Sequence, residues 1–365
     1  MPVLKKIVVQ DFRNIAFQEL EFSPNVNCIS GNNGEGKTNL LDAIYCLSMT
    51  KSAFSQPDRY NCRYGTDSFV IGGTFRMESG TDSRFSIKFS PDGKKIVRDD
   101  KPYSKISEHV GVLPVVMISP SDISMISESG EERRRFANSV LSQMDREYLA
   151  AAQLYSKLLA ERNKLLKGGA ADNDLLDVFD IRMQPAAEKI YAGRKRLTEE
   201  LLPAVKDYYS IISGGVEKVS IEYRSDLSAS SLFDLLRSRR EKDSIFGYTT
   251  AGVQRDDFIF KMNSHPVRHF GSQGQQKSFL VALKFAQYDI MKRAYGFPPT
   301  LLLDDVFDKL DMARISNLIS MVAGSDFGQI FITDSNKVRL SGIVDRITED
   351  RAYFDTSSGV FSKLD

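Results

Sequence analysis

The sequence predicts an α/β protein that combines a mixed sheet, an antiparallel β layer and an inserted helical lobe. Three observations lead to this fold class. A strand, a glycine-rich loop and a helix follow one another near the N-terminus, an almost purely helical pattern begins after residue 120, and alternating strands and helices return later in the chain. We therefore expect a core split between residues 1–120 and 245–365, with residues 121–244 inserted as a helical lobe.

Composition excludes several classes of protein. The 365 residues are 42% hydrophobic and 27% charged, which is typical of a folded soluble protein. No apolar run approaches the roughly 20 residues of a membrane span, and the start lacks a secretory signal, so we expect a cytoplasmic protein with no membrane contact. The three cysteines and three histidines show no metal-ligand spacing. Because the net charge is only +1, nucleic-acid binding would need local basic patches.

The first elements are strands that lead into a loop and a helix. Alternating and β-branched apolar residues predict strands at Val3–Gln10 and from Leu20–Phe22 onward to Val26–Ser30. Apolar residues then recur at helical spacing, which predicts a helix from Lys37 to about Ser48. A strand thus precedes the glycine-rich loop and a helix follows it.

The middle of the chain passes from strands to helices. Phe69–Phe75 and Arg84–Phe89 read as strands of an antiparallel β layer, and Val112–Ile118 reads as a further strand. From residue 121 to residue 210 the apolar residues follow a helical period, broken at Gly168-Gly169. We expect this segment to form the inserted lobe, as a short antiparallel arm.

Strands and helices alternate again in the last third of the chain. Ser278–Met291 and Ile315–Val322 show helical periodicity, and Thr300–Leu303 and Gln329–Thr333 read as buried strands. These elements would complete the sheet that begins in the first thirty residues.

Residues 31 to 38 match the pattern G-x-x-x-x-G-K-[ST] of a phosphate-binding loop. The glycines allow the backbone N–H groups and the N-terminus of the following helix to face phosphate. The lysine brings a positive charge to the β- and γ-phosphates, and the threonine hydroxyl is a ligand for Mg²⁺. We predict that ATP is bound by Gly31, Asn32, Asn33, Gly34, Glu35, Gly36, Lys37 and Thr38.

An apolar strand at residues 301–303 ends in two carboxylates, Asp304 and Asp305. A nucleotide-bound Mg²⁺ needs a carboxylate at the end of a parallel strand beside the phosphate loop. We assign that role to Asp304, and we expect Asp305 to orient or deprotonate the attacking water.

A third motif, residues 270–277, reads Phe-Gly-Ser-Gln-Gly-Gln-Gln-Lys and precedes an amphipathic helix. The Ser272 hydroxyl, the backbone N–H groups near Gly274 and the helix N-terminus all offer donors to an anion. The same residues would also serve as an ordinary helix cap. Their position about 30 residues before the acidic strand favours the phosphate-binding interpretation.

The third motif resembles the signature of ABC-type ATPases, in the S-x-G-Q form of the branch that contains SMC and RecF proteins. The resemblance implies an ABC-type ATPase head in which Ser272 of one copy contacts the γ-phosphate held by the loop of a second copy, with Gly274 and Gln275 also among the nucleotide-binding residues. ATP would thereby join two copies into a homodimer. The resemblance also implies that Asp308–Asp311 crosses that interface, with Asp311 its most recognisable residue.

Within that branch, the chain resembles the RecF family over nearly its whole length. The shared motifs are Asp11–Asn14, the phosphate loop with Asn39–Leu41, Ser119-Pro120 with Asp122, Arg133–Phe136, Gly252 with Arg255–Asp257, the signature, and Leu303–Phe307. The resemblance implies that Arg13 lies at the nucleotide. It also implies a weak, ATP-dependent DNA-binding ATPase that mediates recombination in DNA repair and replication restart. Such a protein acts at junctions of single- and double-stranded DNA with RecR and RecO proteins as partners.

Departures from related families bear on function. Gln254 stands where the RecF family usually has histidine, which leaves the role of that position open. A transporter ATPase subunit would have a glutamine near Ser119, a histidine near Thr333 and a glutamate at 305. Aspartate at 305 suggests slow hydrolysis. An SMC-like DNA-tethering protein would need a longer insertion between Thr38 and Asp304 to form its coiled coil.

Four basic clusters could contact DNA, and the sequence does not show which of them do. They begin at Lys94, Arg133, Arg194 and Arg237. The chain has no tryptophan, and no aromatic residues are interleaved with these clusters, so we expect backbone contact with duplex and not base stacking.

Overall fold

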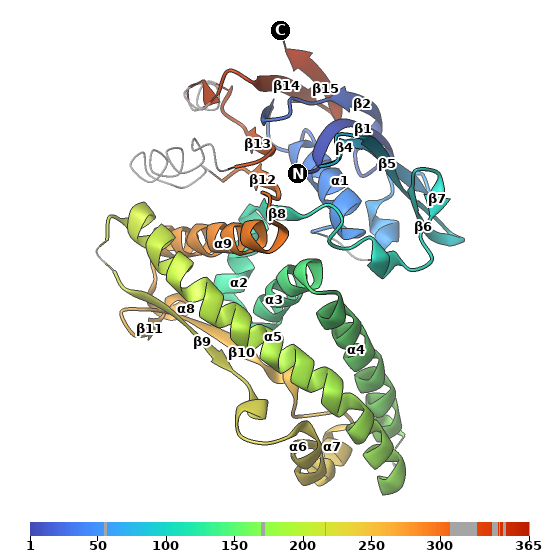
Figure 1. Ribbon diagram of the computed structural model, residues 1–365, viewed down its shortest axis with the longest axis vertical. Coiled ribbons are helices and arrows are strands. Elements are labelled where there is room, and N and C mark those ends of the chain that lie inside the picture. The colour runs from blue at the N-terminus through green and yellow to red at the C-terminus, as the bar shows by residue number, and fades with distance from the viewer. Residues whose placement is uncertain are drawn as a thin grey trace. The chain divides into compact units, whose positions relative to one another are not determined.

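The computed structural model describes residues 1–54, 57–168, 172–215, 217–306, 327–337, 342, 344–345 and 348–364. The chain forms two compact units, coloured by residue number in Figure 1. Unit 1 comprises Met1–Asp122 and Gln287–Asp365, and unit 2 comprises Ile123–Ala286. The sequence placed the second boundary at residue 245, whereas residues 245–286 lie in unit 2. The reason is strand pairing, because β10 (Asp257–Met262) pairs with β9 (Val219–Arg224) inside that unit.

Unit 1 contains a mixed six-stranded sheet in the order β15-β14-β3-β13-β12-β8, in which all pairs are parallel except β14 with β15. Strands β3, β8 and β13 are buried along their whole length, as is usual for parallel strands. The bounds are β3 (Val26–Ser30), β8 (Val115–Ile118), β12 (Thr300–Asp304), β13 (Ile330–Asp334), β14 (Arg351–Ser357) and β15 (Val360–Leu364).

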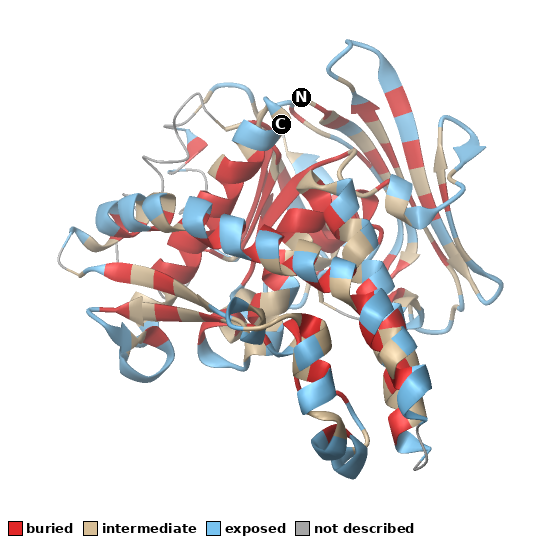
Figure 2. Ribbon diagram, turned by 60° about the horizontal axis from the view of Figure 1, so that its bottom comes forward, coloured by how far each residue is buried: buried red, intermediate tan, exposed pale blue. Residues whose placement is uncertain are grey.

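The second sheet of unit 1 is antiparallel, in the order β2-β1-β4-β5-β6-β7. Side chains on β4 and β5 alternate between buried and more exposed, so one face packs on the core and the other faces outward, as the banding of the strands in Figure 2 shows. The bounds are β1 (Val3–Phe12), β2 (Ile15–Glu21), β4 (Phe69–Arg76), β5 (Asp82–Ser90), β6 (Gly93–Arg98) and β7 (Lys101–Pro102). Short 3₁₀ helices in this unit are Asp58–Asn61, Ile106–Glu108 and Pro120–Ile123.

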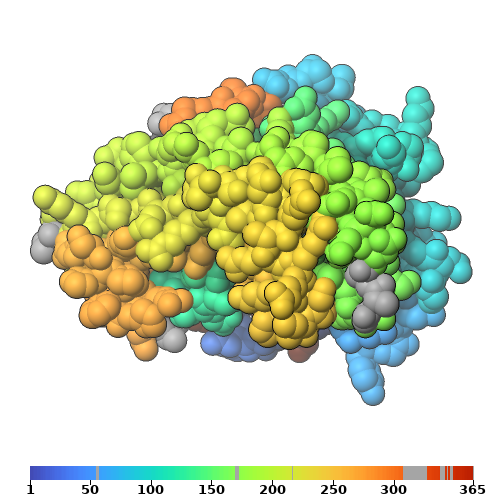
Figure 3. Space-filling view, turned by 90° about the horizontal axis from the view of Figure 1, so that it is seen from below, coloured from blue at the N-terminus to red at the C-terminus, as the bar shows by residue number. Residues whose placement is uncertain are grey.

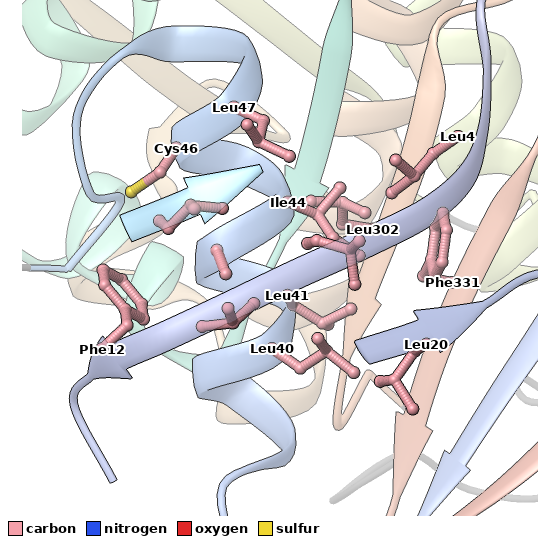
Figure 4. Packing of buried hydrophobic residues seen from close by; sticks show 14 of the residues in the cluster. Leu4, Phe12, Leu20, Leu40, Leu41, Ile44, Cys46, Leu47, Leu302 and Phe331 are labelled. Carbon is pink, nitrogen blue, oxygen red and sulfur yellow. The ribbon is translucent and has the colours of Figure 1, made fainter. Parts of the chain in front are cut away.

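Helix α1 (Lys37–Met49) contacts strands of both sheets and is buried on nearly all sides. In Figure 4, Leu40 and Ile44 of α1 lie among Leu4 of β1, Leu302 of β12 and Phe331 of β13. A helix that is apolar on most of its circumference is typical of a layer between two others. This packing fixes the helix that follows the phosphate loop.

Unit 2 is built from helices and one small sheet, β11-β10-β9, which the sequence reading did not foresee. Two helices of this unit, α4 and α5, pack against each other in the segment where the sequence predicts an arm. Helix α5 has 41 residues and contains Pro185 and Pro203 without ending at either. The helices of unit 2 are α2 (Ser124–Ser127), α3 (Gly130–Met144), α4 (Arg146–Lys167), α5 (Asn173–Ser213), α6 (Leu232–Ser238), α7 (Arg240–Phe246) and α8 (Val267–Phe270), with β11 at His265–Pro266 and 3₁₀ turns at Asp226–Ser228 and Val253–Arg255. Helix α9 (Gln273–Tyr295) begins in unit 2 and ends in unit 1.

No helix within the described ranges is long and apolar enough to cross a membrane. The helix expected at Ile315–Val322 lies outside the described residues.

Candidate functional site

The phosphate loop connects the end of β3 to the start of α1. Gly31, Gly34 and Gly36 have φ angles of 153°, 86° and 111°, a region that residues with a Cβ rarely adopt. Gly36 is also the residue from which α1 begins, so the loop closes directly onto a helix N-terminus. Both glycines that the motif requires, Gly31 and Gly36, therefore adopt a backbone conformation that favours glycine, and so does Gly34.

Lys37 lies inside the loop that precedes it. Its side chain is buried, and Nζ donates hydrogen bonds to the carbonyl oxygens of Gly31 at 2.7 Å and Asn32 at 3.0 Å. Within the described residues no carboxylate forms an ion pair with this ammonium group. The positive charge is therefore held at the loop by carbonyl oxygens alone, where phosphate oxygens would be stronger acceptors.

Thr38 and Asp304 contact each other although they are 266 residues apart. The Thr38 hydroxyl lies 3.0 and 2.9 Å from the two carboxylate oxygens of Asp304. Thr333 of β13, which the sequence reading did not assign to the site, donates a hydrogen bond of 2.7 Å to Asp304 Oδ1. Burial raises the pKa of the Asp304 carboxyl, and the hydrogen bonds from Thr333 and Thr38 oppose that shift.

The strand order explains why these residues meet. Asp304 ends β12 and lies in register with Thr333 on β13, while Ser30 at the end of β3 lies in register with Asp334. The carboxyl ends of the three parallel strands therefore share one edge with the phosphate loop.

The Thr38 hydroxyl and the Asp304 carboxylate suit a magnesium ion. Both are hard oxygen ligands, and Mg²⁺ is commonly held by one or two protein oxygens with phosphate oxygens and waters completing its shell. The part of the chain that the structure describes contains no cluster of three or more histidine, cysteine or acidic side chains that would hold a metal by itself. The donor set therefore fits a metal that arrives with a nucleotide.

Asp305 directly follows this strand end. Its φ is 44°, an uncommon value for a residue with a side chain, and its N–H donates to Thr333 Oγ1 at 3.1 Å. The strand therefore ends at Asp304, and Asp305 adopts the left-handed conformation directly after it.

Arg13, which the resemblance places at the nucleotide, is bound in the structure to α1. Its Nε donates to Asp42 Oδ2 at 3.0 Å and its Nη2 to Ser52 Oγ at 2.9 Å. Asp42 is fully buried, which raises the pKa of its carboxyl, and the charge of Arg13 opposes that shift. The guanidinium is thus held by a fixed partner one turn beyond the phosphate loop.

The signature residues lie together at the start of α9. Gln275 N–H donates to Ser272 Oγ at 3.3 Å, and Ser272 N–H donates to Gln275 Oε1 at 2.7 Å, which is a reciprocal capping box. Ser272 is exposed, Gly274 is half-buried, and Gln275 also donates to Glu217 at 2.7 Å. Both sequence interpretations, helix cap and exposed phosphate donor, are compatible with this geometry. Asp311 and the segment Asp308–Asp311 lie outside the described residues.

Gln254 stands where the RecF-like resemblance would place a histidine, and its side chain bridges Tyr155 and Ala251. Its carbonyl oxygen accepts from the Tyr155 hydroxyl, and its amide donates to the Ala251 carbonyl at 2.8 Å. Because a neutral imidazole also offers one acceptor and one donor, glutamine can replace it in such a bridge. The neighbouring Asp256 and Asp257 are likewise bound, to Arg194 and Arg133.

The phosphate loop between β3 and α1, the acidic strand end of β12 and the capped signature helix define an ABC-type P-loop ATPase head. A family model described as "RecF/RecN/SMC N terminal domain" matches residues 3–349. The chain is 41% identical to "DNA replication and repair protein RecF" of Bacteroides thetaiotaomicron, over 99% of each chain, and 40% identical to the protein of that name from Porphyromonas gingivalis, over 98% of this chain and 99% of the relative. The chain belongs to the RecF family.

Solved structures agree with this assignment. A structure described as "the recombination mediator protein RecF-ATP in RecFOR pathway" matches with a TM-score of 0.90 at 29% identity, over 100% of this chain and 98% of the other. An Smc head domain from Pyrococcus furiosus matches with a TM-score of 0.60 at 15% identity, over 100% of this chain and 96% of the other. The second match concerns the fold alone, and it confirms the ABC-type head that the sequence predicts.

Proposed function

We propose that this protein is an ATP-dependent DNA-binding recombination mediator, which acts at junctions of single- and double-stranded DNA in repair and replication restart. The observation that carries the proposal is the convergence of Lys37, Thr38 and Asp304 at one sheet edge. It occurs in a chain similar along its whole length to a protein whose structure is described with ATP. RecR and RecO proteins are the partners we propose, since the RecFOR pathway is named for all three.

Each residue of the site has its own proposed role in the binding or hydrolysis of ATP. The loop amides and Lys37 would bind the phosphates, and Thr38 and Asp304 would hold Mg²⁺. When bound, the metal supplies charge neutralisation at the β- and γ-phosphates. Asp305 would orient the attacking water, and its short side chain favours slow turnover. Arg13 would approach the nucleotide from its position beside Asp42.

The exposed signature would complete the site of a second copy. Ser272 presents its hydroxyl and the N-terminus of α9 at the surface of unit 2, which suits a phosphate oxygen from outside the chain. Two ATP molecules would then lie between two copies, and Asp311 would lie at the same interface. In this scheme, ATP controls whether the protein is a monomer or a DNA-binding dimer.

Light scattering with and without ATP, repeated with junction DNA, tests this proposal. We expect wild type to dimerise with ATP, Lys37→Ala and Ser272→Ala to stay monomeric, and Asp305→Asn to give a longer-lived dimer because hydrolysis is slowed. Ser231→Ala is the matched control, since Ser231 caps α6 in the same unit with a bond of 3.1 Å to the Asp234 N–H. Monomers under every condition, or equal loss with Ser231→Ala, would overturn the dimer.

One cation in each of three basic clusters is paired within the chain. Arg133 and Arg194 pair with Asp257 and Asp256, both at 2.8 Å or less. Lys94 pairs with Asp58 at 2.5 Å. Charges that are already paired contribute little to phosphate binding. The DNA-binding surface should therefore be sought among exposed cations without such partners.

The outer face of β5 and β6 carries three such cations, Arg84, Lys88 and Lys95. All three are exposed, and within the described ranges none has an ion-pair partner. The register sets Lys88 directly opposite Lys95, an arrangement that is unfavourable in an isolated sheet. Around them on this face lie Val70, Gly72, Thr74, Ser86 and Val97. Asp82 at the start of β5 lies on the same face, and its carboxylate pairs with Arg76 and Lys5.

The spacing of these cations suits duplex DNA. Arg84 and Lys88 are four residues apart on one strand, about 13 Å, and the major groove is about 12 Å wide. On β4, β5 and β6 this face carries no aromatic side chain, which favours contact with the phosphate backbone over base stacking. We therefore include this face in the DNA-binding surface.

The double variant Lys88→Ala/Lys95→Ala should weaken binding to labelled junction DNA and flatten its salt dependence. Each lost phosphate contact should lower the slope of log affinity against log salt by about 0.9. Fluorescence anisotropy at several salt concentrations, with ATP present, measures this slope. The control Lys157→Ala/Lys189→Ala removes two exposed lysines that already pair with Glu161 and Glu147. An unchanged slope in the first variant would exclude this face.

A further inference from the structure

We propose that the C-terminal hairpin β14–β15, together with Asn14, positions the phosphate loop for nucleotide binding. The inference rests on the nucleotide binding of that loop and concerns residues outside it: Asn14, Thr356 and Gly359. They are positioning residues, since they act on phosphate only through the backbone of Glu35 and Gly36.

The carbonyl oxygen of Glu35 is the centre of this arrangement. It accepts hydrogen bonds from the Gly359 N–H at 2.8 Å, from Asn14 Nδ2 at 3.2 Å and from the Thr356 hydroxyl at 3.4 Å. The side-chain carboxylate of Glu35 accepts a further bond from the Ser358 N–H. One residue of the loop is thus bound through both its backbone and its side chain.

The hydrogen bonds to the Glu35 carbonyl also set the direction of the Gly36 N–H. A trans peptide is planar, so the carbonyl of Glu35 and the N–H of Gly36 point in opposite directions. Donors that hold the carbonyl against the hairpin therefore direct the Gly36 N–H away from it, at the position where the loop turns into α1. Amides at this point of the loop are those that face phosphate.

The hairpin also contacts the first residue of the loop. A Cβ on Gly31 would lie 2.6 Å from both the Cγ2 and the carbonyl oxygen of Thr356. The parallel pairing of β14 with β3 brings Asp355 into register with Ser30, which places Thr356 beside the loop. The hairpin thus contacts both the start and the end of the loop.

There is no spare space at the turn of the hairpin. Gly359 has a φ of 80°, and a Cβ there would lie 2.4 Å from the Asn14 carbonyl oxygen. Such a distance cannot be relieved by rotating a flexible side chain, because the neighbouring atom is backbone. A methyl group at residue 359 would therefore push the hairpin away from Asn14 and release the Glu35 carbonyl.

Gly359→Ala, compared with Gly80→Ala, tests the inference. Gly80 lies in the turn between β4 and β5 with a φ of 81°, and a Cβ there would meet nothing within 4 Å. The two variants therefore share the backbone strain, and only Gly359→Ala disturbs the loop. Titration with a fluorescent ATP analogue, well below both Tm values, should show a loss of affinity of about tenfold or more for Gly359→Ala alone. Thermal unfolding should show a larger fall in Tm for Gly359→Ala than for Gly80→Ala, because only the first places a Cβ against backbone.

Further variants separate the possible failures. Asn14→Ala removes the donor to Glu35 and the acceptor for Asn39 Nδ2 without adding bulk, and it should weaken binding a few-fold even if Gly359→Ala does not fold. Wild-type affinity in both Gly359→Ala and Asn14→Ala would overturn the inference. Loss of affinity in Gly80→Ala equal to that in Gly359→Ala would also overturn it, since strain alone would then be the cause. If wild type itself fails to bind the analogue, the proposed function fails instead.

Discussion

Replacing Lys37 by alanine should weaken ATP binding about a hundredfold or more. Hydrogen bonds to charged groups contribute roughly 1.5–3 kcal/mol each, and an ammonium group between two phosphates makes at least two of them. The loop that surrounds Lys37 offers no second cation, because its other members are glycine, asparagine, glutamate and threonine. Titration with a fluorescent ATP analogue measures the change.

Lys94→Ala is a matched control for this variant. Lys94 is a partly buried lysine of the same unit whose Nζ also donates to a backbone carbonyl, that of Thr50, at 2.8 Å. ATP affinity should be unchanged in Lys94→Ala. Equal affinities for Lys37→Ala and wild type would show that the loop does not hold the phosphates, whatever the state of the fold.

Replacing Arg162 by alanine should destabilise unit 2 by about 3–5 kcal/mol, because two buried carboxylates would lose their shared cation. Arg162 is fully buried. It donates to Asp180 at 2.7 Å, to Asp243 at 2.8 Å and to the Thr249 hydroxyl at 2.8 Å. These partners lie on α5, on α7 and just beyond α7. The side chains of α6 and α7, coloured yellow, fill the middle of the face seen in Figure 3.

Thermal unfolding followed by circular dichroism measures this effect. Arg135→Ala is the control, since Arg135 forms only exposed pairs with Glu131 and Glu132 and should change stability by less than about 0.5 kcal/mol. The triple variant Arg162→Met/Asp180→Asn/Asp243→Asn removes the charges together and should recover part of the loss. A loss in Arg162→Ala no larger than that in Arg135→Ala would show that the network does not stabilise the unit.

The parts of the site that could be predicted are those with a local pattern. The glycines, Lys37 and Thr38 could be predicted because they belong to one continuous motif. Asp304 could be predicted because it directly follows an apolar strand. The structure brings Thr38 and Asp304 together as expected. Such residues are recognisable because their chemistry and their neighbours in the chain impose the same pattern.

The supporting residues could not be predicted, because their partners are distant in the chain. In the sequence, Thr333 is one residue of a buried strand like any other. Only the pairing of β13 with β12 shows that it lies beside Asp304. Asn14 and Gly359 lie in separate turns, and neither turn carries a pattern that points to the other. The pairing of β9 with β10 could not be predicted for the same reason. Because of this pairing, unit 2 continues to Ala286, whereas the sequence predicts a boundary at residue 245.

The position of β3 between β13 and β14 has a consequence for synthesis of the protein. Both neighbours of β3 in the sheet are made roughly 300 residues after it, and at about 5–20 residues per second the ribosome needs 15 seconds or more to reach them. During that time β3 has no partner strand, and Asp304 and the hairpin do not yet exist. We therefore expect the phosphate loop of the nascent chain to bind ATP only after nearly all of the 365 residues have been translated. A stalled or shortened product would carry the complete loop motif and still be unable to trap nucleotide.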